Sequence, residues 1–270
     1  MSEVHRVSRD RSILPWRSSL LALLGLILCA AATAQTPLRI AAAADLEPVL
    51  PPLLDEFQQA TGIHAEATYQ ASAALTTQIE NGAPFDVFLA ADVSYPQRLI
   101  GEHQAQGPAD AAEPLVYAHG TLVLWTRTDA ALPPPSLKLL RSPALRRLAI
   151  ANPDRAPYGR AAVAALTSLK LYDALKPRLV TAGNIAQAAQ YVDSGNADAG
   201  LISLTSALTP RLKSAGTYFV IPRNLYPPIE QGAVLVARSQ QQAAAKRFLD
   251  FLLSHPIQAQ LAKSGLSPAK

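Results

Sequence analysis

The sequence predicts an α/β protein built from two lobes, each a mixed, mostly parallel sheet flanked by helices. Three observations support this fold class. Short apolar segments of strand length alternate with longer segments of helical period. The alternation occurs once in each half of the chain, as expected for two βαβ-based units. Polar and proline-containing stretches separate the two halves.

The first unit is predicted from the segment that follows residue 36. Glycine or Asn-Gly pairs close both of its helical segments, because these residues adopt the backbone conformation that ends a helix. The predicted strands are 37–44, 64–71 and 85–92, and the predicted helices are 53–62 and 73–82.

The second half of the chain shows the same alternation. Its predicted strands are 120–128, 146–153, 178–183, 197–204, 217–222 and 232–239, and its predicted helices are 159–175, 185–195 and 241–254. In the last helix, Ala244, Phe248, Phe251 and Leu252 are spaced for one buried face.

Two polar connections, 106–120 and 223–232, are predicted to carry the chain between the lobes. Residues 35–117 and 232–270 would then form lobe 1, and residues 118–231 would form lobe 2. Ligands of open α/β sheets bind beyond the carboxyl ends of the strands, so the site is expected at strand-to-helix turns.

Residues 1–34 have the pattern of a signal peptide that is removed on export. Four arginines precede the apolar run 19–33, and a small-x-small motif ends at Ala34, so cleavage is expected near Ala34-Gln35. The single cysteine, Cys29, follows Leu28, where a lipid-attachment motif needs a small residue. The remaining 236 residues contain no cysteine, which excludes a disulfide framework and thiol chemistry.

The charge of the exported part is close to balanced. Removing four arginines and two acidic residues leaves 20 basic and 18 acidic residues, a formal charge of +2. No Lys/Arg stripe is present, so nucleic-acid binding is not expected.

Four strand-to-helix turns carry a short polar residue or exposed backbone N–H groups. They lie at Ala44-Asp45, at Ser72, at residues 156–159 with Tyr158, and at Asn184 with Gln187 three residues on. The first N–H groups of a helix lack internal partners, and the helix dipole adds partial positive charge there. Together such turns can bind an anion, although each polar residue is equally explained as a helix cap.

Motifs of enzymes and metal centres are missing. The sequence contains no G-x-S-x-G elbow, no P-loop and no H-E-x-x-H, and its histidines are not spaced as metal ligands. We therefore expect no catalytic residues, no cofactor and no metal held directly by side chains.

The segments 72–92, 152–159 and 184–200, together with "AAAADL" at 41–46, resemble the periplasmic molybdate-binding proteins of ABC importers. The most specific part is "QIENGAPFDVFLAAD" at 78–92, and the resemblance covers nearly all of the chain after residue 34. It implies a two-lobed type II periplasmic binding protein fold with the ligand cleft between the lobes.

The resemblance also implies the binding residues. Ser72 matches the family's binding serine, and Tyr158 lies where some members supply a tyrosine hydroxyl. The residues implied as oxyanion ligands are Ala44, Asp45, Ser72, Tyr158 and Ile185, and Asn184 and Ser203 are possible supporting residues. Ser203 stands where many members carry a tyrosine, so Tyr158 is the expected replacement.

Asp45 is the residue least expected at such a site. An ionised carboxylate ~5 Å from a dianion would cost several kcal/mol at an effective dielectric near 20. We therefore expect its carboxylate to cap the following helix and its backbone N–H to face the ligand. Pro51 and Pro52 are expected to kink or delay that helix, whereas Pro48 falls in its first turn, where a missing N–H does not matter.

The implied function is capture of molybdate or tungstate in the periplasm and delivery to an ABC importer permease in the inner membrane. The protein is expected to act as a monomer without a cofactor. One alternative is a binding protein for another small oxyanion, such as phosphate or sulfate. Another is a periplasmic enzyme or partner-binding module on the same scaffold.

Overall fold

The computed structural model describes residues 1–3, 36–108 and 111–269, and Pro37–Lys270 forms one compact unit. The predicted signal peptide therefore lies outside the described residues, apart from its first three. Among the described helices, none is both long enough and apolar enough to cross a membrane.

The first sheet has seven strands in the order β12-β5-β11-β3-β1-β2, with β4 also paired to β11. The strand β1 is parallel to β2 and β3, whereas β11 is antiparallel to β3, β4 and β5. The strands are β1 (Leu38–Ala43), β2 (Ala65–Gln70), β3 (Val87–Ala90), β4 (Ala105–Gln106), β5 (Leu115–Gly120), β11 (Ile229–Val236) and β12 (Ser267–Pro268).

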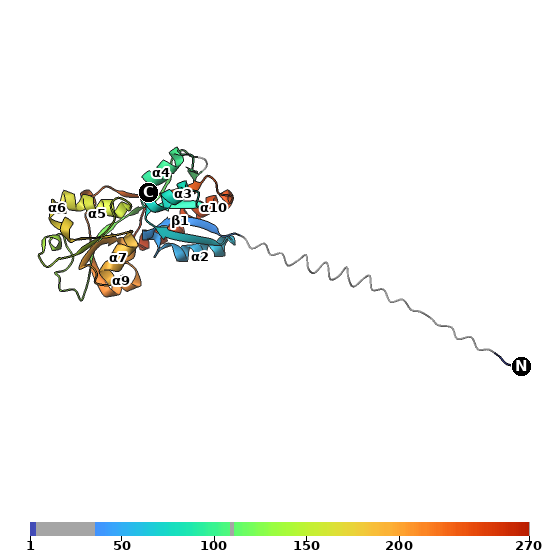
Figure 1. Cartoon of the computed structure of the whole chain (residues 1–270), viewed down its shortest axis with the longest axis horizontal. Helices are drawn as coiled ribbons and strands as arrows, with labels where there is room; N and C mark the ends of the chain where they lie inside the picture. Colours follow the sequence, from blue (N-terminus) through green and yellow to red (C-terminus); the bar gives the residue numbers. More distant parts are fainter. Residues whose placement is uncertain (4–35, 109–110, 270) are drawn as a thin grey trace. The chain divides into compact units, whose positions relative to one another are not determined.

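Helices cover both faces of this sheet (Figure 1). They are η1 (Ala44–Leu46), α2 (Leu50–Thr61), α3 (Ser72–Glu80), α4 (Ser94–Gly101), α10 (Gln242–Leu252) and α11 (His255–Lys263). Alternate residues of a strand point to opposite faces. Accordingly, Ile40 and Val87 pack with α2 and α10, whereas Ala41 and Phe88 pack with α3 and α4. The central strands β1 and β3 are therefore almost wholly apolar.

The second sheet has five strands in the order β10-β6-β9-β7-β8. The strand β7 is parallel to β8 and β9, and β6 is antiparallel to β9 and β10. The strands are β6 (Leu122–Arg127), β7 (Leu148–Ala151), β8 (Leu179–Ala182), β9 (Ala199–Ser203) and β10 (Gly216–Val220). Its helices are η3 (Leu139–Arg141), α5 (Pro157–Ser168), α6 (Tyr172–Leu175), η4 (Lys176–Arg178), α7 (Ile185–Asp193), α8 (Leu204–Ala207), α9 (Pro210–Ala215) and η5 (Arg223–Leu225).

The predicted class, two mixed sheets flanked by helices, is confirmed. The chain leaves the first sheet after Gly120 and enters the second at Leu122, and it returns between Val220 and Ile229. The exact limits of the two lobes stay a prediction.

Several predicted ends of elements are confirmed. The helix α2 ends at Gly62, whose φ of 74° is left-handed, and α3 ends at Asn81. The prolines after Asp45 delay α2 to Leu50, since only a three-residue 3-10 helix forms directly after β1.

Three other predictions are wrong. The long helix 159–175 is interrupted, because Lys170 has a φ of 58° and separates α5 from α6. The connection 106–120 contains strand β5, which pairs with β11. The helix 241–254 is not the last, since α11 and β12 follow it.

Four turns of the fold share one property that positions the site. Each follows the carboxyl end of a parallel strand, where η1 follows β1, α3 follows β2, α5 follows β7 and α7 follows β8. Two of these turns belong to each sheet. The turns that the sequence indicated are therefore at the correct ends of the strands.

Candidate functional site

The four turns surround one small cavity. The space open to the centre of a water-sized sphere is about 10 Å³. Its lining residues are Ala43, Ala44, Asp45, Gln70, Ala71, Ser72, Ala91, Ala156, Pro157, Tyr158 and Ile185. All five residues expected as ligands are therefore brought together, from two sheets.

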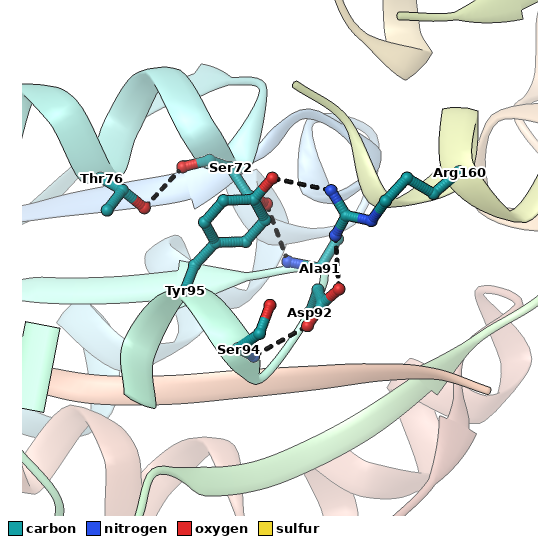
Figure 2. A network of polar contacts seen from close by, with 7 residues as sticks. All are labelled: Ser72, Thr76, Ala91, Asp92, Ser94, Tyr95 and Arg160. Carbon is teal, nitrogen blue, oxygen red and sulfur yellow. Dashed lines mark hydrogen bonds and ion pairs between the residues drawn. The ribbon is translucent and has the colours of Figure 1, made fainter. Parts of the chain in front are cut away.

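Ser72 is the first residue of α3, not the residue before the helix. Its Oγ accepts a hydrogen bond of 3.1 Å from the backbone N–H of Ala91, at the end of β3, as Figure 2 shows. Thr76 donates its hydroxyl to the Ser72 carbonyl at 2.9 Å. Because Ser72 uses its oxygen as the acceptor for Ala91, its hydroxyl hydrogen is available to an acceptor in the cavity.

The carboxylate of Asp45 does not cap a helix, so that expectation is wrong. The N-cap position of η1 is Ala43, and no side chain caps it. Instead, Asp45 is fully buried, and its Oδ2 accepts hydrogen bonds from Tyr158 Oη at 3.0 Å and from Gln231 Nε2. The delay of α2 explains the difference, because no helix N-terminus lies beside Asp45 to be capped.

The hydrogen-bond chain extends beyond Asp45. Gln231 lies in β11, and its Oε1 accepts a hydrogen bond of 2.6 Å from the hydroxyl of Tyr117 in β5. Asp45 Oδ1 is also buried and has no hydrogen-bond partner among the described residues. The two oxygens of this carboxyl therefore differ, since Oδ2 accepts both hydrogen bonds and Oδ1 accepts neither.

Burial raises the pKa of Asp45 from the usual 3.8 to about 6. The hydrogen bonds from Gln231, Tyr158 and its own backbone N–H act in the opposite direction, but they do not outweigh the loss of solvation. The pKa values of Tyr158 and Tyr117 are both raised well above the usual value of a tyrosine. Burial is the largest cause for each, and the nearby charge of Asp45 is the next largest. Both tyrosines therefore remain hydroxyl donors at neutral pH.

Tyr158 is buried at the start of α5. Its hydroxyl donates to Asp45, so the structure gives it a carboxylate partner that the sequence did not indicate. Gly120 makes room for it, because a Cβ at Gly120 would lie 2.3 Å from Tyr158 Oη.

Asn184 is the N-cap of α7, as predicted. Its Oδ1 accepts a hydrogen bond of 2.8 Å from the N–H of Gln187, and Gln187 Oε1 accepts from the N–H of Gly183 at 2.6 Å. Asn184 does not line the cavity itself, but it fixes the first turn of the helix whose first residue, Ile185, does.

Ser203 serves a different helix. It is the N-cap of α8, where its Oγ accepts from the N–H of Ser206 at 3.2 Å and lies 2.9 Å from the hydroxyl oxygens of Thr205 and Ser206. It is not among the lining residues, so its hydroxyl already has partners elsewhere.

A second contact between the sheets lies beside the cavity. Arg160 of α5 donates to the hydroxyl of Tyr95 at 2.8 Å and to the carboxylate of Asp92, and both partners are visible in Figure 2. The guanidinium also lies 5.3 Å from the centre of the Tyr95 ring. No sequence pattern indicated this contact.

The lining of the cavity suits a small anion, with the exception of the carboxyl group of Asp45. No lining residue is Lys, Arg or His, and about half are alanines, which let backbone N–H groups approach closely. The residues that the structure describes hold no group of three or more His, Cys, Asp or Glu able to bind a metal ion. The helices α3, α5 and α7 begin at Ser72, Pro157 and Ile185, which all line the cavity, and the positive end of each helix dipole favours negative charge there.

Comparison with known proteins agrees with this site. Residues 38–267 match a family model described as bacterial extracellular solute-binding protein. The chain is 36% identical over 228 residues to the molybdate-binding protein ModA of Azotobacter vinelandii, which covers 84% of this chain and 88% of that protein. It is 38% identical over 196 residues to ModA of Rhodobacter capsulatus, with 73% and 74% covered.

A solved structure supports the same assignment. The periplasmic molybdate-binding protein of Azotobacter vinelandii superposes with a TM-score of 0.80 and 31% identity, over 86% of this chain and 100% of that one. The expected periplasmic binding protein fold is thereby confirmed. The chain belongs to the bacterial extracellular solute-binding protein family, on the branch of its molybdate-binding members.

Proposed function

We propose that this protein captures molybdate or tungstate and delivers it to an ABC importer. The observation that supports this most directly is the convergence of Ala44, Asp45, Ser72, Tyr158 and Ile185 on one cavity between the turns of two sheets. The relatives named as molybdate-binding proteins support the same ligand.

The oxyanion would be held by dipoles and hydroxyls. The first turns of α3, α5 and α7 offer backbone N–H groups, and the Ser72 hydroxyl adds a side-chain donor. Because the cavity lies between the turns of two sheets, an oxyanion would enter and leave as the units built on these sheets move apart and close again. Such a movement would be a hinge closure at the two connections between the sheets.

The site has features of binding rather than of catalysis. Tyr158 and Asp45 are hydrogen-bonded to each other, and neither contacts a hydroxyl or thiol nucleophile among the described contacts. The proposal therefore includes no enzymatic activity. We further propose that the protein acts as a monomer and that its partner is a permease in the inner membrane. The proposal also includes export to the periplasm with cleavage near Ala34-Gln35.

The test is a thermal melt of the exported, desalted protein with molybdate, tungstate, sulfate and phosphate in turn. A ligand at about a thousandfold over its dissociation constant stabilises the folded state by about 4 kcal/mol. For a chain of this size, that raises Tm by about 10 °C. A shift with molybdate and tungstate alone supports the proposal, whereas a shift with sulfate or phosphate alone contradicts it.

Ser72→Ala tests the site itself. Losing a hydrogen bond to a charged ligand should weaken molybdate binding by about 1–3 kcal/mol, roughly tenfold to a hundredfold. The matched control is Thr76→Val, since Thr76 lies one turn further along α3 and does not line the cavity. Equal affinity of the Ser72→Ala variant and the wild type, measured by calorimetric titration, would remove Ser72 from the site.

A further inference from the structure

One feature of the cavity is not accounted for by dipoles and hydroxyls, namely the carboxyl group of Asp45. It is fully buried in the wall of a cavity that is proposed to receive a dianion. The lining residues include no cation to compensate it. This inference rests on the proposed function and asks how a site with its own acidic group accepts an anion.

The hydrogen bonds of Asp45 distinguish its two oxygens. Tyr158 and Gln231 both donate to Oδ2, whereas Oδ1 is buried without a partner among the described residues. A proton on this carboxyl therefore belongs on Oδ1, because Oδ2 already accepts two hydrogen bonds. A protonated Oδ1 changes the group from a repelling charge into one more hydrogen-bond donor.

The surroundings of Asp45 offer no other way to neutralise it. Helix α5 brings Tyr158 and β5 brings Tyr117, and both are hydroxyls at neutral pH, while β11 brings the uncharged Gln231. The other elements packed against η1 are α7, α8 and β2. Their titratable groups are Tyr191 and Asp193 of α7, the latter paired with Arg211, and Glu66 and Tyr69 of β2, whereas α8 has none.

We propose that the cavity takes up its oxyanion together with one proton from solvent, which resides on Oδ1 of Asp45 and is shared with an oxygen of the anion. The O–H of the carboxyl then donates to the anion, while Tyr158 and Gln231 keep their bonds to Oδ2. No covalent bond of the anion changes. Because the proton enters with the dianion, the site gains one negative charge instead of two.

The pKa of Asp45 gives the pH range in which this uptake is measurable. In the empty site, burial raises that pKa to about 6 even though hydrogen bonds to the carboxyl lower it, and a bound dianion raises it further, since a nearby negative charge favours the neutral carboxyl. Above about pH 6, the empty site is therefore ionised and the loaded site is protonated, so binding consumes one proton. The affinity should fall about tenfold for each pH unit in that range.

The experiment is calorimetric titration of the exported protein with sodium molybdate between about pH 6.5 and 8.5, in pairs of buffers that differ in ionisation enthalpy. The wild type should take up about one proton and lose affinity as the pH rises. In Asp45→Asn, the side-chain carbonyl can accept from Tyr158 and Gln231, and the amide N–H takes the place of the proton. That variant should show no proton uptake and a nearly constant affinity, tighter than wild type at the highest pH.

The matched control is Asp129→Asn, which neutralises an exposed carboxylate paired with Arg127 in the second sheet. It should keep the proton uptake of the wild type.

Molybdate binding by the wild type without proton uptake would overturn the inference and leave the proposed function intact. Loss of molybdate binding by a stably folded Asp45→Asn would also overturn it, because the carboxylate would then be needed as an acceptor. If Asp45→Asn does not fold, the proton count of the wild type decides. Absence of molybdate binding by the wild type at every pH would instead overturn the proposed function, and the inference with it.

Discussion

At the scale of single residues, the cavity combines very small side chains with one buried acid. Ala43, Ala44, Ala71, Ala91 and Ala156 form about half of its lining, so backbone groups rather than side chains reach the interior. Asp45 is the exception, and its carboxyl is held by donors from elements distant in sequence. Tyr158 is 113 residues away along the chain and Gln231 is 186 residues away.

The burial of Asp45 predicts how stability depends on pH in the absence of ligand. The pKa is about 6 in the folded protein and 3.8 is usual, so the folded state binds more protons between these values. Stability therefore falls as the pH rises from about 4 to 6, by at most about 3 kcal/mol. Asp45→Asn has no buried carboxyl to ionise, so its stability should rise relative to that of the wild type as the pH increases over the same range.

Urea unfolding of both proteins at about pH 4.5 and pH 7.5 would measure this difference. A difference in unfolding free energy that is the same at both pH values would show that the carboxyl is not unusually hard to ionise.

Sequence reasoning indicated five residues that line one cavity, but not the interactions of Asp45. The resemblance placed Ser72, Tyr158 and Ile185 correctly at turns, and the structure brings them to one cavity. The capping prediction failed because it assumed a helix starting at Asp45, whereas α2 starts at Leu50. Gln231 and Gly120 were missed, since their roles depend on contacts with Asp45 and Tyr158 that no local pattern records. Gln231 also lay in the predicted polar connection 223–232, whereas the structure places it in strand β11.

At the scale of elements, the site depends on helices that begin at the correct strand ends. Apolar runs followed by a polar residue and a helical period made these turns predictable, and Asn184 is an example that the structure confirms. The break at Lys170 was not predictable in the same way, because the apolar spacing continues through it and only its φ of 58° ends the helix. The strand β5 was missed because its segment directly follows the polar residues 110–114 and was interpreted as part of the same connection.

The cap of α7 gives a prediction at this scale. Asn184→Ala should destabilise the protein by about 1 kcal/mol. It should also weaken molybdate binding by roughly threefold, since the first turn that faces the cavity loses its anchor. Thr209→Ala is the matched control, because Thr209 caps α9 and does not line the cavity. Chemical unfolding and titration together would separate the effects. A loss of affinity in both variants would show that general destabilisation, rather than the α7 turn, is responsible.

At the scale of the whole molecule, the two sheets are joined by two connections and by several polar contacts. Tyr158 reaches Asp45, Arg160 reaches Asp92 and Tyr95, and the N–H of Ala73 donates to the Arg155 carbonyl at 3.3 Å. All of them start from the segment around the beginning of α5. This segment therefore contributes several of the polar contacts between the units of the two sheets.

Arg160→Met should shift the molecule away from the closed arrangement. Arg160 does not line the cavity, so any effect on the ligand must act through the placement of the two sheets. A half-buried ion pair of this kind contributes about 1 kcal/mol, so molybdate binding should weaken by roughly fivefold. Arg98→Met is the control, because Arg98 pairs only with Glu80 and Glu102 on the same side. Unchanged affinity in the Arg160 variant, measured by titration, would show that this contact does not support closure.

The absence of Lys, Arg and His from the cavity lining has a consequence for where such a protein can work. Outside the cytoplasm, ionic strength follows the surroundings of the cell. Dissolved ions weaken attraction between exposed charges, but they hardly reach contacts of a few ångström in a closed, buried site. The formal charge of residues 35–270 is only +2, so long-range attraction of the anion is also weak from the start. The affinity for the anion should thus be nearly the same at high as at low ionic strength. Titrations in dilute buffer and in buffer rich in sodium chloride would compare the two.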